Sequence, residues 1–127
     1  MNILGIGVDI IEIERVQNFV HKNPRFLEKI FTNDERKYFE SKGFKIESIA
    51  GNFAAKEAIS KSLGTGIRKF KLKDIEILRD ELGKPIVKTY NNLEKICIDY
   101  NISEIMVSIS HCKQYAVANA VAITKEW

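Results

Sequence analysis

The chain has 127 residues, which is enough for one domain with a buried core and too few for two. Hydrophobic residues make up 45% and charged residues 29%, a globular mixture, and the net charge of +3 is below that of a dedicated nucleic-acid binder. No apolar run approaches the ~20 residues of a membrane span, and the two cysteines stand in no metal-ligand spacing. We therefore expect a single cytoplasmic domain over residues 1–127, with no membrane and no nucleic acid, and with a phosphorylated small molecule or an acidic protein as partner.

The N-terminal segment predicts a buried strand with an acidic side chain near its end. Residues 3–11 are dominated by isoleucine, leucine and valine, and Gly5 and Gly7 allow another backbone to approach closely. Asp9 falls where this strand should end. It can cap the next helix, because Glu12 stands three residues later as in a capping box, or it can belong to a functional site. Both interpretations are open at this point.

Helical segments are predicted next. An apolar repeat of about 3.6 residues indicates a helix over residues 12–21, which an Asn-Pro pair ends. A short segment, residues 25–31, leads to a Thr-Asn-Asp-Glu capping box at residues 32–35, which opens a helix to about residue 42. The longest helix is expected from residue 46 or 47 to residue 63.

The rest of the chain is mainly predicted as strands. Residues 71–78 and 85–90 form a pair joined by a turn, and the second of them lies near an edge because it begins with proline. A helix is expected from residue 91 or 92 to about residue 100, and residues 104–110 and 115–124 form a closing hairpin. One strand, several helices and then a mainly antiparallel sheet around one more helix predict an α+β domain.

The longest helix carries a carboxylate on an otherwise apolar face. Four residues spaced four apart share this face: Ile49, Phe53, Glu57 and Lys61. A carboxylate on a face that points to the core has to be paired, protonated or bound to a metal, because burying a lone charge is costly. An ordinary exposed Glu–Lys pair, worth roughly 0.3 to 0.5 kcal/mol, explains the spacing equally well.

A glycine turn and a basic stretch follow this helix. Gly64 and Gly66 supply a C-terminal stop and leave backbone amides free for an anion. Between residues 58 and 73 there is no acidic residue and there are five basic ones: Lys61, Arg68, Lys69, Lys71 and Lys73. A solvated face accounts for this run, and so does an edge that faces phosphate next to Glu57.

Asp9 and Glu57 are the candidate metal ligands. Two carboxylates without a histidine or cysteine cluster favour a hard cation, usually Mg²⁺, which completes its shell with water and substrate phosphate. Lys61, one helical turn beyond Glu57, suits a phosphate oxygen or a leaving group. These residues predict Mg²⁺-assisted transfer of a phosphoryl group.

Four motifs in the same order resemble one known family. They are Gly5-Ile6-Gly7-Val8-Asp9-Ile10 with Arg15, Phe53-Ala54-Ala55-Lys56-Glu57-Ala58 with Lys61 and Gly64-Thr65-Gly66, Gly83-Lys84-Pro85, and Ser108-Ile109-Ser110-His111. Together they are similar to the holo-[acyl-carrier-protein] synthases, the small bacterial type of 4'-phosphopantetheinyl transferase. One position departs from the pattern: Asn52 stands where family members often carry an arginine, which affects one phosphate contact.

The resemblance implies an activity and the residues that carry it. The enzyme would move the 4'-phosphopantetheine group of coenzyme A onto a serine of apo acyl carrier protein and release adenosine 3',5'-bisphosphate, a step in fatty acid biosynthesis. Asp9 and Glu57 would bind Mg²⁺ with the pyrophosphate of coenzyme A. Glu57, directly or through a metal-bound water, would take the serine proton, and Lys61 would stabilise the leaving charge.

The resemblance also implies how the remaining contacts are arranged. His111 and the glycine segment with Gly64 and Gly66 would lie near the nucleotide end of coenzyme A. Lys42 and Lys45 would reach it from a neighbouring subunit, because family members form trimers with sites at subunit interfaces.

Two basic residues are candidates for docking the acidic carrier protein. Arg15 and Arg25 would act by electrostatic steering and register, although each can also be an ordinary surface charge. His111 can likewise be a turn residue bonded to backbone. Two other functions stay open: a Mg²⁺-dependent hydrolase that cleaves a pyrophosphate-containing nucleotide, and a non-catalytic module that binds a carrier protein.

Overall fold

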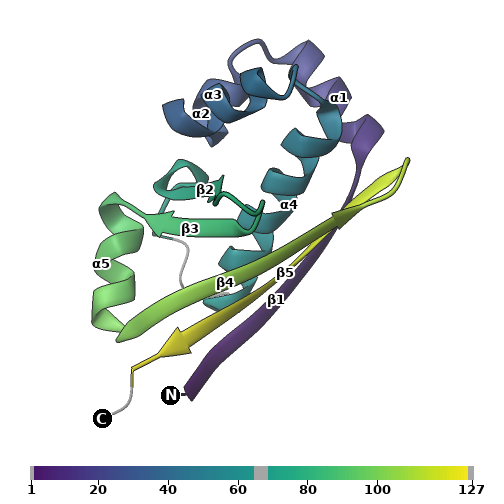
Figure 1. Ribbon diagram of the computed structural model, residues 1–127. Helices are drawn as coiled ribbons and strands as arrows, with labels where there is room; N and C mark the ends of the chain where they lie inside the picture. The colour runs from purple at the N-terminus through teal and green to yellow at the C-terminus, as the bar shows by residue number, and fades with distance from the viewer. Residues whose placement is uncertain (1, 65–68, 126–127) are drawn as a thin grey trace.

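One long helix organises the fold: α4 (Ile46–Ser62) lies along one face of a three-stranded sheet (Figure 1). The structure is a computed structural model that describes residues 2–64 and 69–125. In the strand β5 (Tyr115–Thr124), every second residue from Ala116 to Ala122 is a buried alanine. Small side chains on this face let the helix approach the sheet closely.

β5 is the central strand of this sheet. It pairs antiparallel with β1 (Asn2–Glu12) on one side and with β4 (Ile102–His111) on the other. The N-terminal strand and the C-terminal hairpin predicted from the sequence are therefore confirmed as elements, each slightly longer than expected. The expectation that the first strand is buried is wrong within one chain, because β1 is an edge strand and the side chains on its outer face are exposed. Among the described residues no helix has both the length and the apolar character needed to cross a bilayer.

Asp9 lies within β1 and does not end it. It is paired with Ala118, and the strand continues to Glu12. The next helix, α1 (Ile13–Lys22), has Glu12 at its N-cap position and no side-chain cap bond. The alternative that Asp9 caps this helix is thus wrong, because the strand's ladder carries the backbone three residues further.

Two short helices cover the N-terminal half of α4. α2 (Phe26–Ile30) is followed by α3 (Asn33–Ser41), whose predicted capping box is present: the amide of Glu35 donates to Thr32 Oγ1 at 3.2 Å, and the Thr32 amide donates to Glu35 Oε1 at 2.9 Å. A small aromatic core forms beneath them. The buried rings of Phe31 and Phe39 meet edge to face with centroids 4.9 Å apart.

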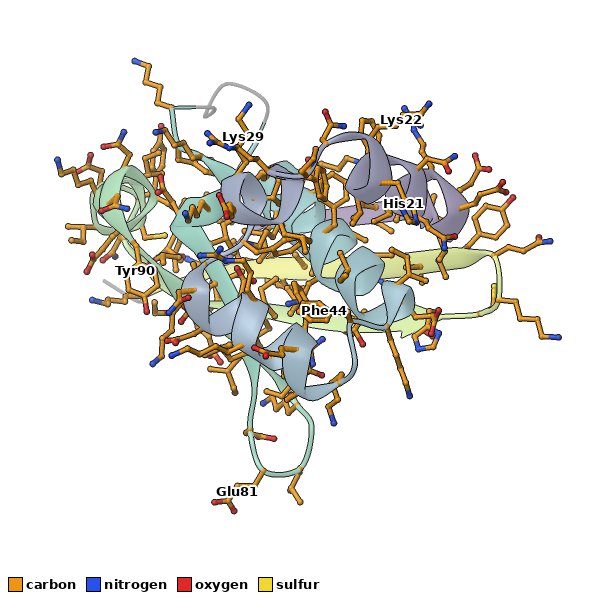
Figure 2. All side chains as sticks on the ribbon, turned by 90° about the horizontal axis from the view of Figure 1, so that it is seen from above. His21, Lys22, Lys29, Phe44, Glu81 and Tyr90 are labelled. Atoms are coloured by element: carbon orange, nitrogen blue, oxygen red, sulfur yellow. The ribbon has the colours of Figure 1, made fainter. Side chains whose placement is uncertain are left out.

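The remaining strands form a separate two-stranded sheet, so the expected single sheet is corrected to two. β2 (Ile75–Arg79) pairs antiparallel with β3 (Pro85–Thr89), and α5 (Asn91–Asp99) follows. The strand predicted from residue 71 starts later, because Leu72–Asp74 forms a 3₁₀ turn. Figure 2 shows the turn between β2 and β3, marked by Glu81, projecting from the body of the molecule.

A buried ion pair joins α4 to α3 and β2. Lys56 Nζ lies 2.6 Å from Glu35 Oε1, and both side chains are fully buried. The ammonium group also donates to three backbone carbonyls, those of Ile30, Leu72 and Ile75. Glu35 Oε2 accepts the amide of Ile77 at 3.0 Å. Burial raises the pKa of Glu35 and lowers the pKa of Lys56, so burial favours the neutral form of each group. The attraction and the hydrogen bond between the two groups act in the opposite direction and favour the charged forms.

Gly7 marks the closest approach between β1 and α4. A Cβ atom at this position would overlap the carbonyl oxygen of Ala58 and would lie 2.8 Å from the amide nitrogen of Ser62. Both neighbours are backbone atoms, so the strand or the helix would have to move. We expect Gly7→Ala to lower the free energy of unfolding by about 1–3 kcal/mol, measured by urea denaturation. Ser110→Ala on the exposed face of β4 is the control, and equal midpoints for both variants would contradict this account.

Candidate functional site

Asp9 and Lys61 form an ion pair on one flank of α4. Lys61 Nζ lies 3.0 Å from Asp9 Oδ1 and donates to the carbonyl oxygen of Val8 at 2.9 Å. Asp9 shares the face of β1 that Gly5 and Gly7 turn toward the helix, because side chains alternate along a strand. The side chain of Asp9 is 17% exposed and that of Lys61 is 47% exposed, so a ligand can reach both.

Glu57 stands one helical turn before Lys61 on the same flank. It is half-buried and lines a cavity of about 250 Å³ together with Ser60, Phe70 and Leu72. A turn of α-helix rises 5.4 Å, so the side chains of Glu57 and Lys61 are neighbours. The structure therefore places both predicted acids beside Lys61, although they are 48 positions apart in the sequence.

The chemistry of these oxygen donors fits a hard cation. Among residues 2–64 and 69–125, no group of three His, Cys, Asp or Glu side chains is placed to hold a metal by itself. A cation held by Asp9 and Glu57 would thus need water and ligand oxygens to complete its shell, which is how Mg²⁺ is commonly bound beside phosphates.

A second cavity, of about 460 Å³, lies on the other flank of α4. Two of the sequence motifs meet here: the segment 83–85 between β2 and β3, and the end of β4 with His111. Lys42 is not among the lining residues, although its Nζ lies 5.9 Å from the ring centroid of Tyr38, which is one of them. The predicted role of Lys42 in nucleotide binding stays a prediction.

The two groups of predicted residues line different cavities within one chain. Glu57 and Gly51, which line the two cavities, are about 120° apart around the helix at 3.6 residues per turn. Figure 1 shows β1 on one side of α4 and the β2–β3 pair on the other. Asp9 on β1 and His111 on β4 are separated by the central strand β5, since Asp9 pairs with Ala118 and His111 with Ala116.

Three other residues were predicted to contact the nucleotide: Gly64, Lys45 and Gly66. Gly64 follows α4 with a φ of +93°, as expected for a glycine that stops a helix. Lys45 directly precedes α4 and is exposed. Gly66 lies outside the described residues. The roles of these three residues in nucleotide binding stay predictions.

Arg15 and Arg25 are both exposed, on α1 and at the start of α2. On the same two helices the structure reveals an aromatic pair that the sequence analysis missed. The ring of Phe19, which is partly exposed, stacks on that of Phe26 with centroids 5.9 Å apart. Figure 2 shows further basic side chains on the outer surface of the same helices, those of Lys22 and Lys29. The mixture of cations and exposed aromatic rings suits an acidic protein surface.

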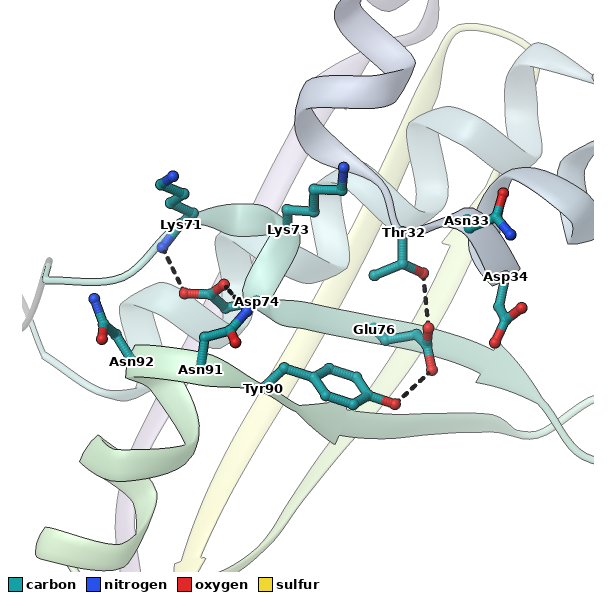
Figure 3. Close-up of a pocket in the computed structure, with 10 residues that line it drawn as sticks. All are labelled: Thr32, Asn33, Asp34, Lys71, Lys73, Asp74, Glu76, Tyr90, Asn91 and Asn92. Carbon is teal, nitrogen blue, oxygen red and sulfur yellow. Dashed lines mark hydrogen bonds between the residues drawn. The ribbon is translucent and has the colours of Figure 1, made fainter.

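A cavity of about 670 Å³ lies between α3, β2 and α5, and two structural carboxylates line it (Figure 3). Asp74 accepts bonds from the amide of Lys71 and from Asn91 Nδ2, at 3.1 and 3.2 Å. Glu76 accepts bonds from Thr32 Oγ1 and Tyr90 Oη, at 2.7 and 3.2 Å. Every oxygen of these two buried carboxylates accepts a hydrogen bond from within the chain. The two side chains therefore join the 3₁₀ turn and β2 to α3 and α5, which is a structural role.

Comparison with known proteins agrees with this arrangement. A family model described as the 4'-phosphopantetheinyl transferase superfamily matches residues 5–120. A holo-[acyl-carrier-protein] synthase from Alkaliphilus metalliredigens is 56% identical over 120 residues, which cover 94% of this chain and 98% of that protein.

Solved structures share the fold. The holo-[acyl-carrier-protein] synthase of Neisseria meningitidis superposes with a TM-score of 0.89 at 34% identity, covering 97% of this chain and 100% of that chain. The enzyme from Bacillus anthracis, in complex with CoA (3',5'-ADP), superposes with a TM-score of 0.78 at 41% identity, covering 97% and 98%. With both carboxylates and Lys61 on one flank of the central helix and a family match over nearly its whole length, the chain belongs to the 4'-phosphopantetheinyl transferase superfamily.

Proposed function

We propose that the chain transfers the 4'-phosphopantetheine group of coenzyme A to a serine hydroxyl of apo acyl carrier protein and releases adenosine 3',5'-bisphosphate. The observation that carries the proposal is the placement of Asp9 and Glu57 beside Lys61, in a chain 56% identical to a holo-[acyl-carrier-protein] synthase. A cytoplasmic location and a role in fatty acid biosynthesis belong to the same proposal and rest on the sequence resemblance.

Asp9, Glu57 and Lys61 divide the chemistry between them. Asp9 and Glu57 would hold Mg²⁺, which when bound supplies positive charge for the diphosphate of coenzyme A. Lys61, now 3.0 Å from Asp9, is free to turn its ammonium group to a phosphate oxygen of the leaving nucleotide, since its side chain is half exposed. Glu57 is within the same flank and accepts the serine proton, directly or through one water.

The carrier protein would dock on α1 and α2. Arg15 and Arg25 attract its acidic surface, and the partly exposed ring of Phe19 gives an apolar contact. This surface adjoins β1, because Ile13 directly follows the strand that carries Asp9.

The complete site would form in a homotrimer. The face of β1 that points away from α4 carries three apolar side chains that are 54–68% exposed: Ile6, Val8 and Ile10. Such a continuous apolar patch is typical of a protein interface. In this proposal, covering it with other copies would bring the cavity at His111 of one subunit to the acids of the next.

Val8→Asp is therefore expected to convert the trimer to monomers and to remove transfer activity, since a charge on this face would be buried without a partner. Light scattering after size-exclusion chromatography reports the mass. Ile98→Asp is the matched control, because Ile98 is a similarly exposed aliphatic residue on α5. Monomers with full activity would contradict the shared site.

The function is tested by incubating the protein with Mg²⁺, coenzyme A and apo acyl carrier protein. A gain in carrier mass of one phosphopantetheine group supports the transferase. Cleavage of coenzyme A without the carrier would instead identify a hydrolase, and a complex without turnover would identify a binding module.

A further inference from the structure

Arg79 lies on the wall of the cavity that His111 lines, and its guanidinium group is held in place from two sides. Its Nη2 donates to Asn52 Oδ1 at 2.8 Å, and its Cζ lies 5.1 Å from the ring centroid of Tyr38. Asn52 is fully buried, and its Nδ2 donates to the carbonyl oxygen of Ile77 at 3.0 Å. Because the Nδ2 of Asn52 is committed to a carbonyl, its Oδ1 faces the arginine.

The charge of Arg79 lacks a carboxylate partner in the described part of the chain. Within residues 2–64 and 69–125 the ion pairs are Lys56–Glu35 and Lys61–Asp9, and no carboxylate oxygen lies within 4.0 Å of the guanidinium nitrogens. Burial lowers the pKa of Arg79, which means that water no longer fully solvates its charge. A guanidinium has five N–H donors, and the bonds to Asn52 and to the carbonyl of Leu78 occupy two of them.

The surroundings favour an anion. Lys84 also lines this cavity, whereas Glu47 is the single acid among its described lining residues. A half-buried arginine that is stacked on an aromatic ring and oriented by an amide is well suited to a phosphate, because its donor fork matches two phosphate oxygens.

We propose that Arg79, positioned by Asn52 and Tyr38, binds the 3'-phosphate at the nucleotide end of coenzyme A. This inference rests on the proposed function, in which the diphosphate lies at Asp9 and Glu57 of a neighbouring copy. The 3'-phosphate is the remaining phosphate of coenzyme A, and the cavity lined by Arg79 and Lys84 offers it two cations. Asn52, at the position where family members often carry an arginine, thus serves to orient an arginine that comes from β2.

The test compares coenzyme A with dephospho-coenzyme A, which lacks the 3'-phosphate. Wild-type enzyme is expected to prefer coenzyme A in kcat/KM by roughly 10- to 100-fold, as for a hydrogen bond to a charged group. Arg79→Gln should remove most of this preference by lowering kcat/KM for coenzyme A, with a much smaller loss for dephospho-coenzyme A. Arg79→Lys should restore part of it. Lys88→Gln, at an exposed position of β3 outside the cavity, is the control and should keep the preference.

A preference that survives in Arg79→Gln, or an equal loss with both substrates, would overturn the inference while transfer itself continued. Calorimetry on wild-type protein gives a test that does not depend on how the variant folds. Adenosine 3',5'-bisphosphate should bind more tightly than adenosine 5'-monophosphate by a similar factor, and equal affinities would also overturn the inference. If the wild type transferred nothing but its preference for the bisphosphate were lost in Arg79→Gln, the proposed function would fail and the phosphate site would stand.

Discussion

Glu57→Gln is expected to reduce transfer to the carrier protein by about 100- to 10,000-fold, the range for loss of a general base. The amide is almost the same size as the carboxylate, but it neither accepts a proton nor carries the charge that attracts Mg²⁺. Glu57 is half-buried beside a small cavity, so the change is expected to leave the urea midpoint unaltered. The measurement is the rate of carrier mass gain at saturating coenzyme A.

Two further variants distinguish the loss of transfer in Glu57→Gln from a general effect of removing a carboxylate charge. Glu94→Gln, an exposed carboxylate early in α5, should transfer at the wild-type rate. Asp9→Asn, which removes charge from the other candidate ligand, should raise the Mg²⁺ concentration needed for half-maximal rate. Normal turnover in Glu57→Gln together with an unchanged Mg²⁺ requirement in Asp9→Asn would refute the assignment of these acids.

Lys56→Met is expected to lower the free energy of unfolding by about 3–5 kcal/mol, because it leaves the carboxylate of Glu35 buried without its cation. The change also removes the hydrogen-bond donor to three backbone carbonyl oxygens, which come from the end of α2, the 3₁₀ turn and β2. Equilibrium unfolding in urea, followed by circular dichroism, gives the value.

The control is Lys37→Met on α3, since Lys37 is exposed and its replacement should cost little. The double variant Lys56→Met with Glu35→Leu should be less destabilised than the sum of the two single variants, because neither charge is then left alone. Strict additivity would show that the pair is not coupled, and a Lys56→Met protein as stable as the control would show that the buried pair contributes nothing.

The elements that depend on local patterns could be predicted from the sequence. The capping box at Thr32 and Glu35 involves residues three apart, and it forms as expected. The glycine after α4 is an equally local signal. What failed was pairing between distant segments: β1 extends past Asp9 because β5 continues to pair with it, and β2 and β3 form a sheet of their own.

The candidate site could be predicted in part for the same reason. Asp9, Glu57 and Lys61 were found because each is a charged residue in an apolar element. Lys56 carried a similar signal, a lysine among buried alanines, but its partner Glu35 lies 21 positions away and nothing local identifies it. Arg79 gave no signal, since its contact with Asn52 exists only after β2 has packed against α4.

The alanines that β5 turns toward α4 have a consequence for how the enzyme works. A methyl group has no rotamers, so the gap between helix and strand is set by main-chain contact and not by side-chain conformation. Asp9 is fixed to the sheet and Glu57 to the helix, which gives the two acids a separation that thermal motion of side chains in the interface hardly changes. The cation site that we propose at these two acids would thus be preorganised before any substrate arrives.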